Sequence, residues 1–282
     1  MKEKLFIPRG TGRITDMAWS PNGRKLAAIT DRGWLLVWYP SSAQRIVSLQ
    51  LCHRQLLCVA WSQQGTSLIV GDGRGALYRV EELSAPSPVI HCHLFDFAIR
   101  KISCSPGTRG RRYLVVSGST LILMDEGGTE THLLYPTEIL NAAWAEDGCT
   151  LAVVCADGLV ELVDASQEQK RQPLAGVLCP QCLAWQKDGN LLAIGTTHGT
   201  VHLYDPPTNT LGEAVVCSRF PIRALAWGGG GLLLKDEMNG LTFVQEQEAL
   251  PLASIRTTTF ALNRAGTQLA TVQLNSVAIA PF

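Results

Sequence analysis

The stretch from Cys182 to Asp205, CLAWQKDGNLLAIGTTHGTVHLYD, predicts three short strands joined by two tight turns. Its first apolar run ends at Trp185 and its last one closes on Tyr204 and Asp205. The turns contain Asp188-Gly189 and His198-Gly199, and aspartate and glycine tolerate the backbone of a tight turn. Strands separated in this way favour an antiparallel meander. One such sheet cannot bury its faces alone, so the pattern should recur.

The first strand of this unit occurs in seven copies along the chain. The copies end at intervals of 42, 43, 40, 41, 42 and 35 residues, at Trp19, Trp61, Cys104, Trp144, Trp185, Trp227 and Leu262. A period near 40 with four strands per unit is typical of a β-propeller. The residue before each end is alanine, except for Ser103 in the third copy. A small residue at this position suits strands that crowd around a central axis, and we expect a closed ring.

The two ends of the chain complete one another. The last copy has only three strands before Phe282, and a spare strand, Lys4 to Ile7, precedes the first copy. Joining this strand to the last copy would leave no open edge in the ring. The sequence therefore predicts an all-β fold: one domain, residues 1–282, with seven blades of four antiparallel strands, the last blade completed by the N-terminal strand. Two of the predicted outer strands are Leu211 to Cys217 and Ala249 to Ile255.

The pattern resembles the WD-repeat β-propeller family over essentially the whole chain. The matching segments are Trp19-Ser20-Pro21-Asn22-Gly23, Asp157-Gly158 through Val163-Asp164, and His198-Gly199 through Tyr204-Asp205. No copy ends in Trp-Asp, and the Gly-His pair that opens many family repeats is absent. The family's buried Asp-His-Ser/Thr-Trp network is therefore incomplete, and we expect packing to hold the blades together. The resemblance implies a scaffold that binds other proteins and usually has no catalysis of its own.

The amino-acid composition limits which kinds of binding partner and which cellular compartment we expect. The 24 basic and 24 acidic side chains give a net charge of zero, without the basic footprint of a nucleic-acid-binding protein. No apolar run is long enough to span a membrane, and the start of the chain lacks the features of a signal peptide. Nine cysteines at scattered spacings indicate buried thiols in a reducing compartment. We expect a cytoplasmic protein.

Three short motifs have a chemical interpretation beside a structural one. The C-x-x-C pair Cys179 and Cys182 lacks the helix start that favours a redox thiolate, and no second pair completes a zinc site. His91 and His93 lie on one face of an outer strand without a third ligand nearby in sequence. The basic cluster Arg109 to Arg112 is either a solvated loop or an acidic contact. We expect structural roles for all three and predict no metal site.

The position at the start of each first strand is the most informative one about a binding surface. The residues there are Thr15, Leu57, Arg100, Leu140, Gln181, Arg223 and Thr258. Copies that agree elsewhere differ at this position, as a binding face would, although drift at exposed sites gives the same picture. Arginine is enriched at interface hot spots, and apolar neighbours supply anchors. We predict that these residues form a partner-binding rim around the central channel.

The predicted function is that of a non-catalytic protein-interaction scaffold, or subunit of a multiprotein complex, which binds one or more proteins at this rim. We expect no cofactor, no catalytic residues, and no nucleic-acid, membrane or small-molecule ligand. The alternatives are a propeller hydrolase or lyase with catalytic groups on the axis, and a purely architectural subunit. An enzyme would bring together acid or base groups with perturbed pKa values. No Gly-x-Ser-x-Gly, P-loop or calcium-loop motif is present.

Overall fold

The structure is a computed structural model that describes residues 3–81, 83, 89–106, 112–125, 127–165, 170–187, 190–246, 248–273 and 276–282. Apart from one short 3-10 helix, η1 (Pro40–Ser42), the elements in the described residues are strands. None of these residues forms a helix that is long and apolar enough to cross a bilayer.

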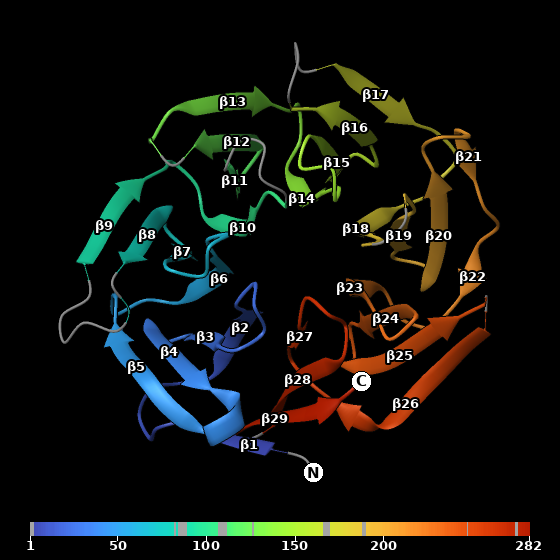
Figure 1. The fold of residues 1–282 in the computed structure, drawn as a ribbon. Helices are drawn as coiled ribbons and strands as arrows, with labels where there is room; N and C mark the ends of the chain where they lie inside the picture. The colour runs from blue at the N-terminus through green and yellow to red at the C-terminus, as the bar shows by residue number, and fades with distance from the viewer. Residues whose placement is uncertain are drawn as a thin grey trace. The chain divides into compact units, whose positions relative to one another are not determined.

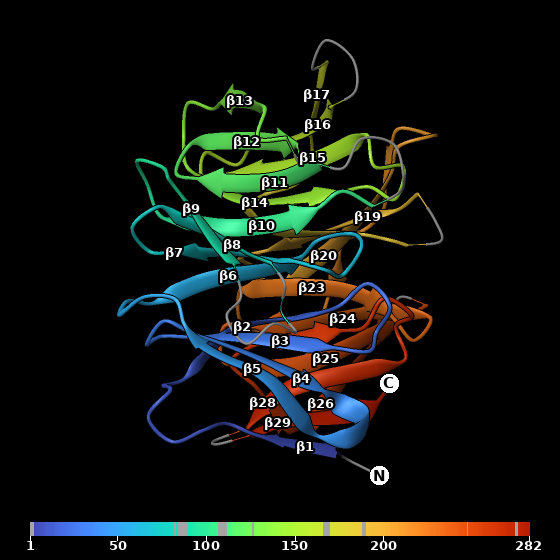
Figure 2. The same ribbon diagram turned by 60° about the vertical axis from the view of Figure 1, so that its left-hand side comes forward.

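The strands form seven antiparallel sheets that follow the chain order (Figure 1). The first three sheets are β2 (Ile14–Trp19), β3 (Leu26–Thr30), β4 (Trp34–Tyr39) and β5 (Gln44–Gln50); β6 (Leu56–Trp61), β7 (Leu68–Asp72), β8 (Ala76–Glu81) and β9 (Val89–Leu94); and β10 (Ile99–Cys104), β11 (Arg112–Ser117), β12 (Thr120–Asp125) and β13 (Glu130–Leu134). Figure 2 shows β2, β3, β4 and β5 side by side.

The next three sheets repeat the arrangement. They are β14 (Ile139–Trp144), β15 (Thr150–Cys155), β16 (Val160–Asp164) and β17 (Arg171–Leu174); β18 (Pro180–Trp185), β19 (Leu192–Thr196), β20 (Thr200–Asp205), β21 (Thr210–Leu211) and β22 (Val215–Val216); and β23 (Ile222–Gly228), β24 (Gly231–Asp236), β25 (Gly240–Gln245) and β26 (Glu248–Arg256). The last sheet has the order β1 (Glu3–Phe6), β29 (Ser276–Pro281), β28 (Gln268–Gln273) and β27 (Phe260–Leu262).

These sheets confirm the predicted fold class, a seven-bladed β-propeller whose last blade is completed by the N-terminal strand. β1 pairs with β29 from Glu3 opposite Ile279 to Phe6 opposite Ser276, and Leu5 is fully buried. The chain divides into two compact units, residues 1–104, 113–118 and 257–282, and residues 105–112 and 119–256. The single-domain organisation stays a prediction.

Two predicted strands differ from the observed ones. The outer strand expected from Leu211 to Cys217 is split into β21 and β22, with Gly212 between them donating its N–H to the carbonyl of Leu203 at 2.8 Å. Glycine weakens the interior of a strand. The first strand of the seventh copy ends at Leu262, as predicted, but has only three residues and begins at Phe260. The hydroxyl of Thr257 accepts the N–H of Val272 at 2.9 Å, so a side chain replaces a backbone partner there.

Neighbouring sheets pack through their apolar faces. In the first unit, one core joins Ile29, Leu35 and Val37 of the first sheet to Leu56 and Val70 of the second. In the second unit, a similar core joins the fourth sheet to the fifth, with Val154 and Ile194 among its buried residues. In both units, therefore, core residues lie between neighbouring sheets, which bury their apolar faces against one another.

A recurring hydrogen bond also joins neighbouring sheets. We call the alanines that precede the last residue of the first strands the alanine column, and the tryptophans that end these strands the tryptophan column. The indole N–H of such a tryptophan donates to the backbone carbonyl of the alanine in the preceding copy. The four pairs are Trp19 with Ala261 at 3.1 Å, Trp61 with Ala18 at 2.9 Å, Trp185 with Ala143 at 3.1 Å, and Trp227 with Ala184 at 3.0 Å. Trp144 differs, because its buried Nε1 has no hydrogen-bond partner among the described residues. The tryptophan and alanine columns thus act together.

Asp16 adds a polar link between the first two sheets. Its Oδ2 accepts the N–H of Val59 on β6 at 3.1 Å, and its Oδ1 accepts the N–H of Met17 at 2.9 Å. Burial raises the pKa of this carboxyl from 3.8 to about 6, although these amides and the charge of Lys101 act in the opposite direction.

Removing the N-terminal strand should destabilise the last blade. Deletion of residues 1–8 exposes the edge of β29, and Leu5→Ala removes a fully buried side chain. We expect each change to lower the free energy of unfolding by about 2–5 kcal/mol in a denaturant titration. Phe6→Ala is the matched control, because the Phe6 side chain is 75% exposed. An unchanged midpoint for Leu5→Ala would refute the shared last blade.

The alanine column should not accept a larger side chain. Ala184 is buried, and its carbonyl accepts the indole N–H of Trp227. Ala184→Leu should therefore lower the free energy of unfolding by about 1–3 kcal/mol, since added methyl groups push the two first strands apart. Ala214→Leu, at an exposed position, should leave the denaturant midpoint where it is. Equal midpoints for the two variants would show that the column faces open space.

The raised pKa of Asp16 predicts a pH dependence of stability. The folded protein holds this proton more tightly than the unfolded chain, so the stability that Asp16 contributes falls as pH rises from about 4 to about 6. Asp16→Asn cannot lose a proton, so its unfolding free energy should gain on that of the wild type by about 2 kcal/mol across this window. Lys101→Gln should extend the window to higher pH, because it removes a charge that lowers the pKa of Asp16 in the folded protein. Parallel stability curves for the Asn variant and the wild type would contradict the raised pKa.

Candidate functional site

Six of the seven predicted rim residues occupy the same irregularity of the backbone. The pairing of each first strand with its second strand shifts by one residue at its start, and the extra residue is Thr15, Leu57, Arg100, Leu140, Gln181 or Arg223. Such a β-bulge leaves one residue without a ladder partner and re-aims its side chain. Thr258, the seventh, is exposed and precedes the short strand β27. We call the end of each sheet that carries these residues the bulge end.

The bulges leave a pattern in the sequence. With one extra residue, the buried positions of β2 and β14 fall at the first, fourth and sixth residues instead of alternating. Ile14, Met17 and Trp19 follow this order in β2. Ile139, Ala142 and Trp144 follow it in β14. A strand with strict alternation would bury residues two apart, so the break in period was the available signal for the bulges.

Some of the predicted rim residues make contacts that stabilise the fold, and others are exposed. The hydroxyl of Thr15 lies 2.7 Å from the carbonyl oxygen of Leu56 and 3.2 Å from that of Ile29, so it links two sheets. Leu140 is partly buried against the core between the fourth and fifth sheets. Arg100 is exposed. Thr15 and Leu140 therefore serve the fold, which leaves less of each side chain for a partner.

Arg223 and Gln181 are brought together at the bulge end of the second unit. Arg223 donates from Nη1 to Oε1 of Gln181 at 2.7 Å and from Nη2 to Oε1 of Glu237 at 2.6 Å. Although no acidic residue neighbours Arg223 in sequence, Glu237 supplies one from the turn after β24. Both ionic side chains stay more than 40% exposed. The guanidinium is thus oriented by two partners and still open to solvent.

Polar residues at the ends of second strands shape the loops at the bulge end, and sequence reasoning did not single them out. Asp72 accepts the N–H groups of Arg74 at 2.8 Å and Ala76 at 2.9 Å, and its Oδ2 accepts the hydroxyl of Tyr78 at 3.3 Å. These bonds fix the turn between β7 and β8. The polar residue after an apolar strand was the available signal. Packing is therefore supplemented by local polar networks.

The sixth sheet shows how such a network holds an apolar surface in place. Asp236 accepts the N–H of Gly240 at 2.9 Å and the hydroxyl of Ser218 at 2.8 Å. Ser218 in turn accepts the N–H of Phe220 at 3.1 Å. This joins the loop before β23 to the turn after β24, the segments that carry Phe220 and Met238. Both side chains are exposed.

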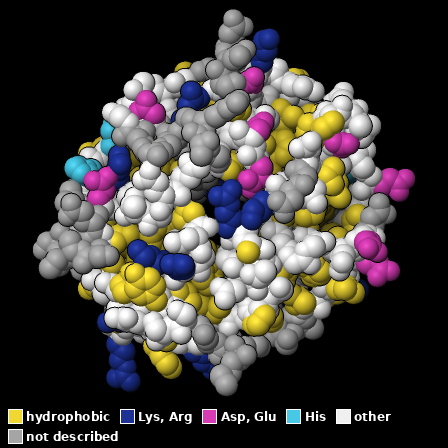
Figure 3. Space-filling view, viewed as in Figure 1, with side chains coloured by type: hydrophobic (Ala, Val, Ile, Leu, Met, Phe, Trp, Pro, Cys, Tyr) yellow, Lys and Arg dark blue, Asp and Glu magenta, His cyan; other side chains and the backbone are white. Residues whose placement is uncertain are grey.

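Large apolar side chains that remain exposed gather at the bulge ends of the sheets. Four lie in loops or turns there: Phe97, Leu178, Phe220 and Met238. Four more are the last residues of outer strands that end there: Phe6, Leu94, Leu134 and Val216. In the turns at the opposite end, no described residue is an exposed large apolar one. Figure 3 views the molecule from the side of the opposite ends, and it draws hydrophobic side chains beside Lys or Arg side chains there as well.

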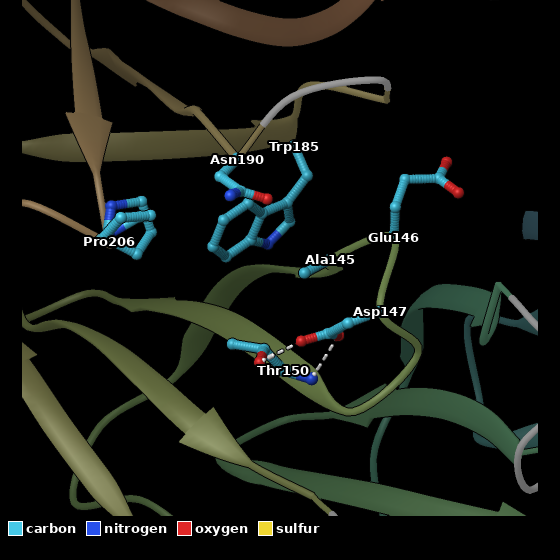
Figure 4. Close-up of a pocket in the computed structure, with 8 residues that line it drawn as sticks. Ala145, Glu146, Asp147, Thr150, Trp185, Asn190 and Pro206 are labelled. Carbon is cyan, nitrogen blue, oxygen red and sulfur yellow. Dashed lines mark hydrogen bonds between the residues drawn. The ribbon is translucent and has the colours of Figure 1, made fainter.

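A cavity of about 200 Å³ lies at the opposite end, between the fourth and fifth sheets (Figure 4). Its lining includes Glu146, Asp147, Trp185, Asn190 and Pro206. The Asp147 carboxylate is occupied by its own turn, since it accepts the backbone N–H and the hydroxyl of Thr150 at 2.8 and 2.6 Å. The cavity is separate from the predicted rim.

The short motifs give no chemical site among the described residues. All nine cysteines are free thiols; Cys179 is exposed, and Cys182 is buried with its Sγ 3.5 Å from the carbonyl oxygen of Ile222. His91 Nε2 lies 3.8 Å from Oε2 of Glu81. Within the described part of the chain, no three His, Cys, Asp or Glu side chains are placed to hold a metal ion. Arg109 to Arg111 of the basic cluster lie outside the described residues.

Comparison with known proteins finds a family match for one segment of the chain. The family described as the WD40 domain of anaphase-promoting complex subunit 4 matches residues 175–229, which run from the loop after β17 to the turn after β23. No curated protein matches the chain. The matched segment contains the whole fifth blade, including the stretch from Cys182 to Asp205. Together with the seven four-stranded blades, this match supports a protein of the WD-repeat β-propeller family.

Proposed function

We propose that the chain is a non-catalytic interaction scaffold, a subunit of a multiprotein complex that binds a partner protein at the bulge ends of its sheets. WD-repeat propellers are in general protein-interaction scaffolds and typically not enzymes. The matched family is itself named for a complex subunit, which agrees with this role. Free thiols in a chain of nine cysteines suit a reducing compartment, and we propose the cytoplasm.

The observation that carries this proposal is the uneven distribution of exposed apolar side chains. Eight large apolar side chains stay exposed at the bulge ends, and none does so among the described residues of the opposite turns. Five of the eight belong to the second unit, and exposed apolar surface bordered by polar groups marks an interaction site. Aromatic residues, methionine and arginine are the types enriched at protein interfaces. Phe220, Met238 and Arg223 on the sixth sheet meet this description.

The partner should present carboxylates and apolar side chains. Arg100 is exposed, and the Arg223 guanidinium is held by Gln181 and Glu237 in a fixed orientation. A planar guanidinium that is already oriented binds a carboxylate with less loss of side-chain freedom. Leu178 is 75% exposed on the loop before β18, close in sequence to Gln181, and would cover an apolar residue of the partner. The seven predicted rim residues thus remain a prediction within a wider surface.

The test is recovery of partners by the tagged protein from its native cytosol. Leu178→Ser with Met238→Ser, and separately Arg100→Ala with Arg223→Ala, should each remove the proteins that co-purify with the wild type. An anchor of this kind typically contributes ~2 kcal/mol or more to binding. The melting temperature should not change, because the substituted side chains are exposed.

The matched control lies at the opposite end. Asn190→Ala with Pro207→Ala alters two exposed residues of the cavity between the fourth and fifth sheets and should leave recovery intact. The reverse result, in which this control loses the partner and the bulge-end variants keep it, would place the working surface at the opposite end. That outcome would refute the proposal.

A further inference from the structure

The outer strands of the sheets differ in how well they are protected against pairing with another strand. An outer strand leaves backbone N–H and C=O groups open on one side, and proteins protect such edges with charges, prolines, bulges or breaks. Six outer edges carry such a feature: Lys4 in β1, Arg45 and a bulge in β5, Glu130 in β13, Pro173 in β17, the break between β21 and β22, and Pro251 with a bulge in β26.

β9 is the exception. Its sequence, VIHCHL, contains no proline, lysine, arginine or acidic residue. It pairs with β8 without a shift in register, from Ala76 opposite Leu94 to Glu81 opposite Val89. It lies at the end of its sheet, so its far edge has no strand beside it in this sheet. β9 is therefore a straight, regular edge that another strand can extend.

The side chains of β9 are exposed on both faces. Ile90 is 42% exposed and Leu94 is 74% exposed, and with Cys92 they lie on one face because side chains alternate along a strand. His91 and His93 lie on the other face, where His91 is near Glu81 and the His93 ring packs against Phe95 with centroids 4.5 Å apart and the ring planes tilted by 43°. One face of the edge is thus apolar and the other carries imidazoles.

The order of these residues is the same in both directions from Cys92. Reading outward, each side shows a histidine and then a large aliphatic residue, His91 and Ile90 on one side, His93 and Leu94 on the other. An antiparallel strand of the same sequence centred on Cys92 would place Ile90 opposite Leu94 of the second copy, His91 opposite His93, and Cys92 opposite Cys92. We propose that β9 is a homodimerisation edge, which pairs with β9 of a second copy about a two-fold axis at Cys92.

This pairing satisfies both faces of the strand. Two Ile–Leu pairs and the central cysteine pair would cover the apolar face, and directly opposed apolar side chains are the unit of sheet stabilisation. Opposed neutral imidazoles can hydrogen-bond, because each ring has one donor and one acceptor nitrogen. A two-fold axis requires a surface that is complementary to itself, and the order of residues in β9 has that property. Since one strand pair buries little area, we expect a reversible dimer with Kd in the range of about 10–100 µM.

The test uses the full chain in sedimentation velocity under reducing conditions, over about 5–500 µM protein. The wild type should shift from monomer to dimer across this range. Ile90→Lys introduces a charge at the edge twice per dimer and should raise Kd by about tenfold or more. Leu250→Lys, at an exposed position of the outer strand β26, is the matched control and should dimerise like the wild type.

The register is tested by oxidation with diamide. Directly opposed residues have Cα atoms about 4.5–5.5 Å apart, within the range of about 4.4–6.8 Å that a disulfide spans. Two Cys92 thiols would form a disulfide, and diamide would take up the two electrons and two protons that they release. The cross-linked dimer should be lost in Cys92→Ser and kept in Cys179→Ser, which removes another exposed thiol.

Three results would overturn the proposal: a monomer at every concentration, a dimer that Ile90→Lys leaves unchanged, or a dimer cross-linked through a cysteine other than Cys92. Ile90 lies outside the bulge end, so Ile90→Lys should still recover the partner proteins of the wild type. A loss of dimerisation is thereby distinguished from a loss of the proposed scaffold function.

Discussion

The hydrogen bond from a tryptophan indole to the carbonyl of an alanine in the preceding copy sets the distance between neighbouring sheets. Four such bonds, of 2.9 to 3.1 Å, occur within the two units. The indole reaches the carbonyl only if the first strands approach closely, and a side chain larger than alanine at that position would separate them. One bond of this kind contributes only about 1 kcal/mol, but a buried indole without a partner costs more. The two columns therefore depend on one another.

The same constraint explains why the start of each first strand is free to vary. The tryptophan end of the strand is fixed by its bond to the preceding copy, and the bulge places one extra residue before the fixed part. That residue has no ladder partner, so pairing imposes no side chain on it. The positions hold threonine, leucine, arginine or glutamine. Divergence there is consistent with binding, but the role of Thr15 in joining β2 to β6 shows that part of it serves the fold.

The sequence predicted the architecture better than the site. The residues that repeat from copy to copy are those that pack in the core, whereas the residues of the site differ between copies. Six of the seven first strands end at the predicted residue, such as Trp19, since an apolar strand that ends in tryptophan in most copies recurs at a nearly constant period. The late start of β27 and the break between β21 and β22 were not predicted, because a threonine hydroxyl and a glycine decide them locally. The partners of Arg223 were not predictable from neighbours in sequence. Gln181 and Glu237 reach it from another sheet and from the turn after β24.

The two ends of the sheets satisfy their polar groups alike but differ in apolar exposure. At the opposite end, turns are closed by their own side chains, as where Asn263 accepts the N–H of Thr267 at 2.8 Å. At the bulge end, the hydrogen bond between Ser218 and Asp236 stabilises the turns in the same way. The polar backbone groups of the turns are hydrogen-bonded at both ends. The turns therefore do not require Phe220 or Met238 to be apolar and exposed. Contact with another protein would give these side chains the burial that the fold does not provide.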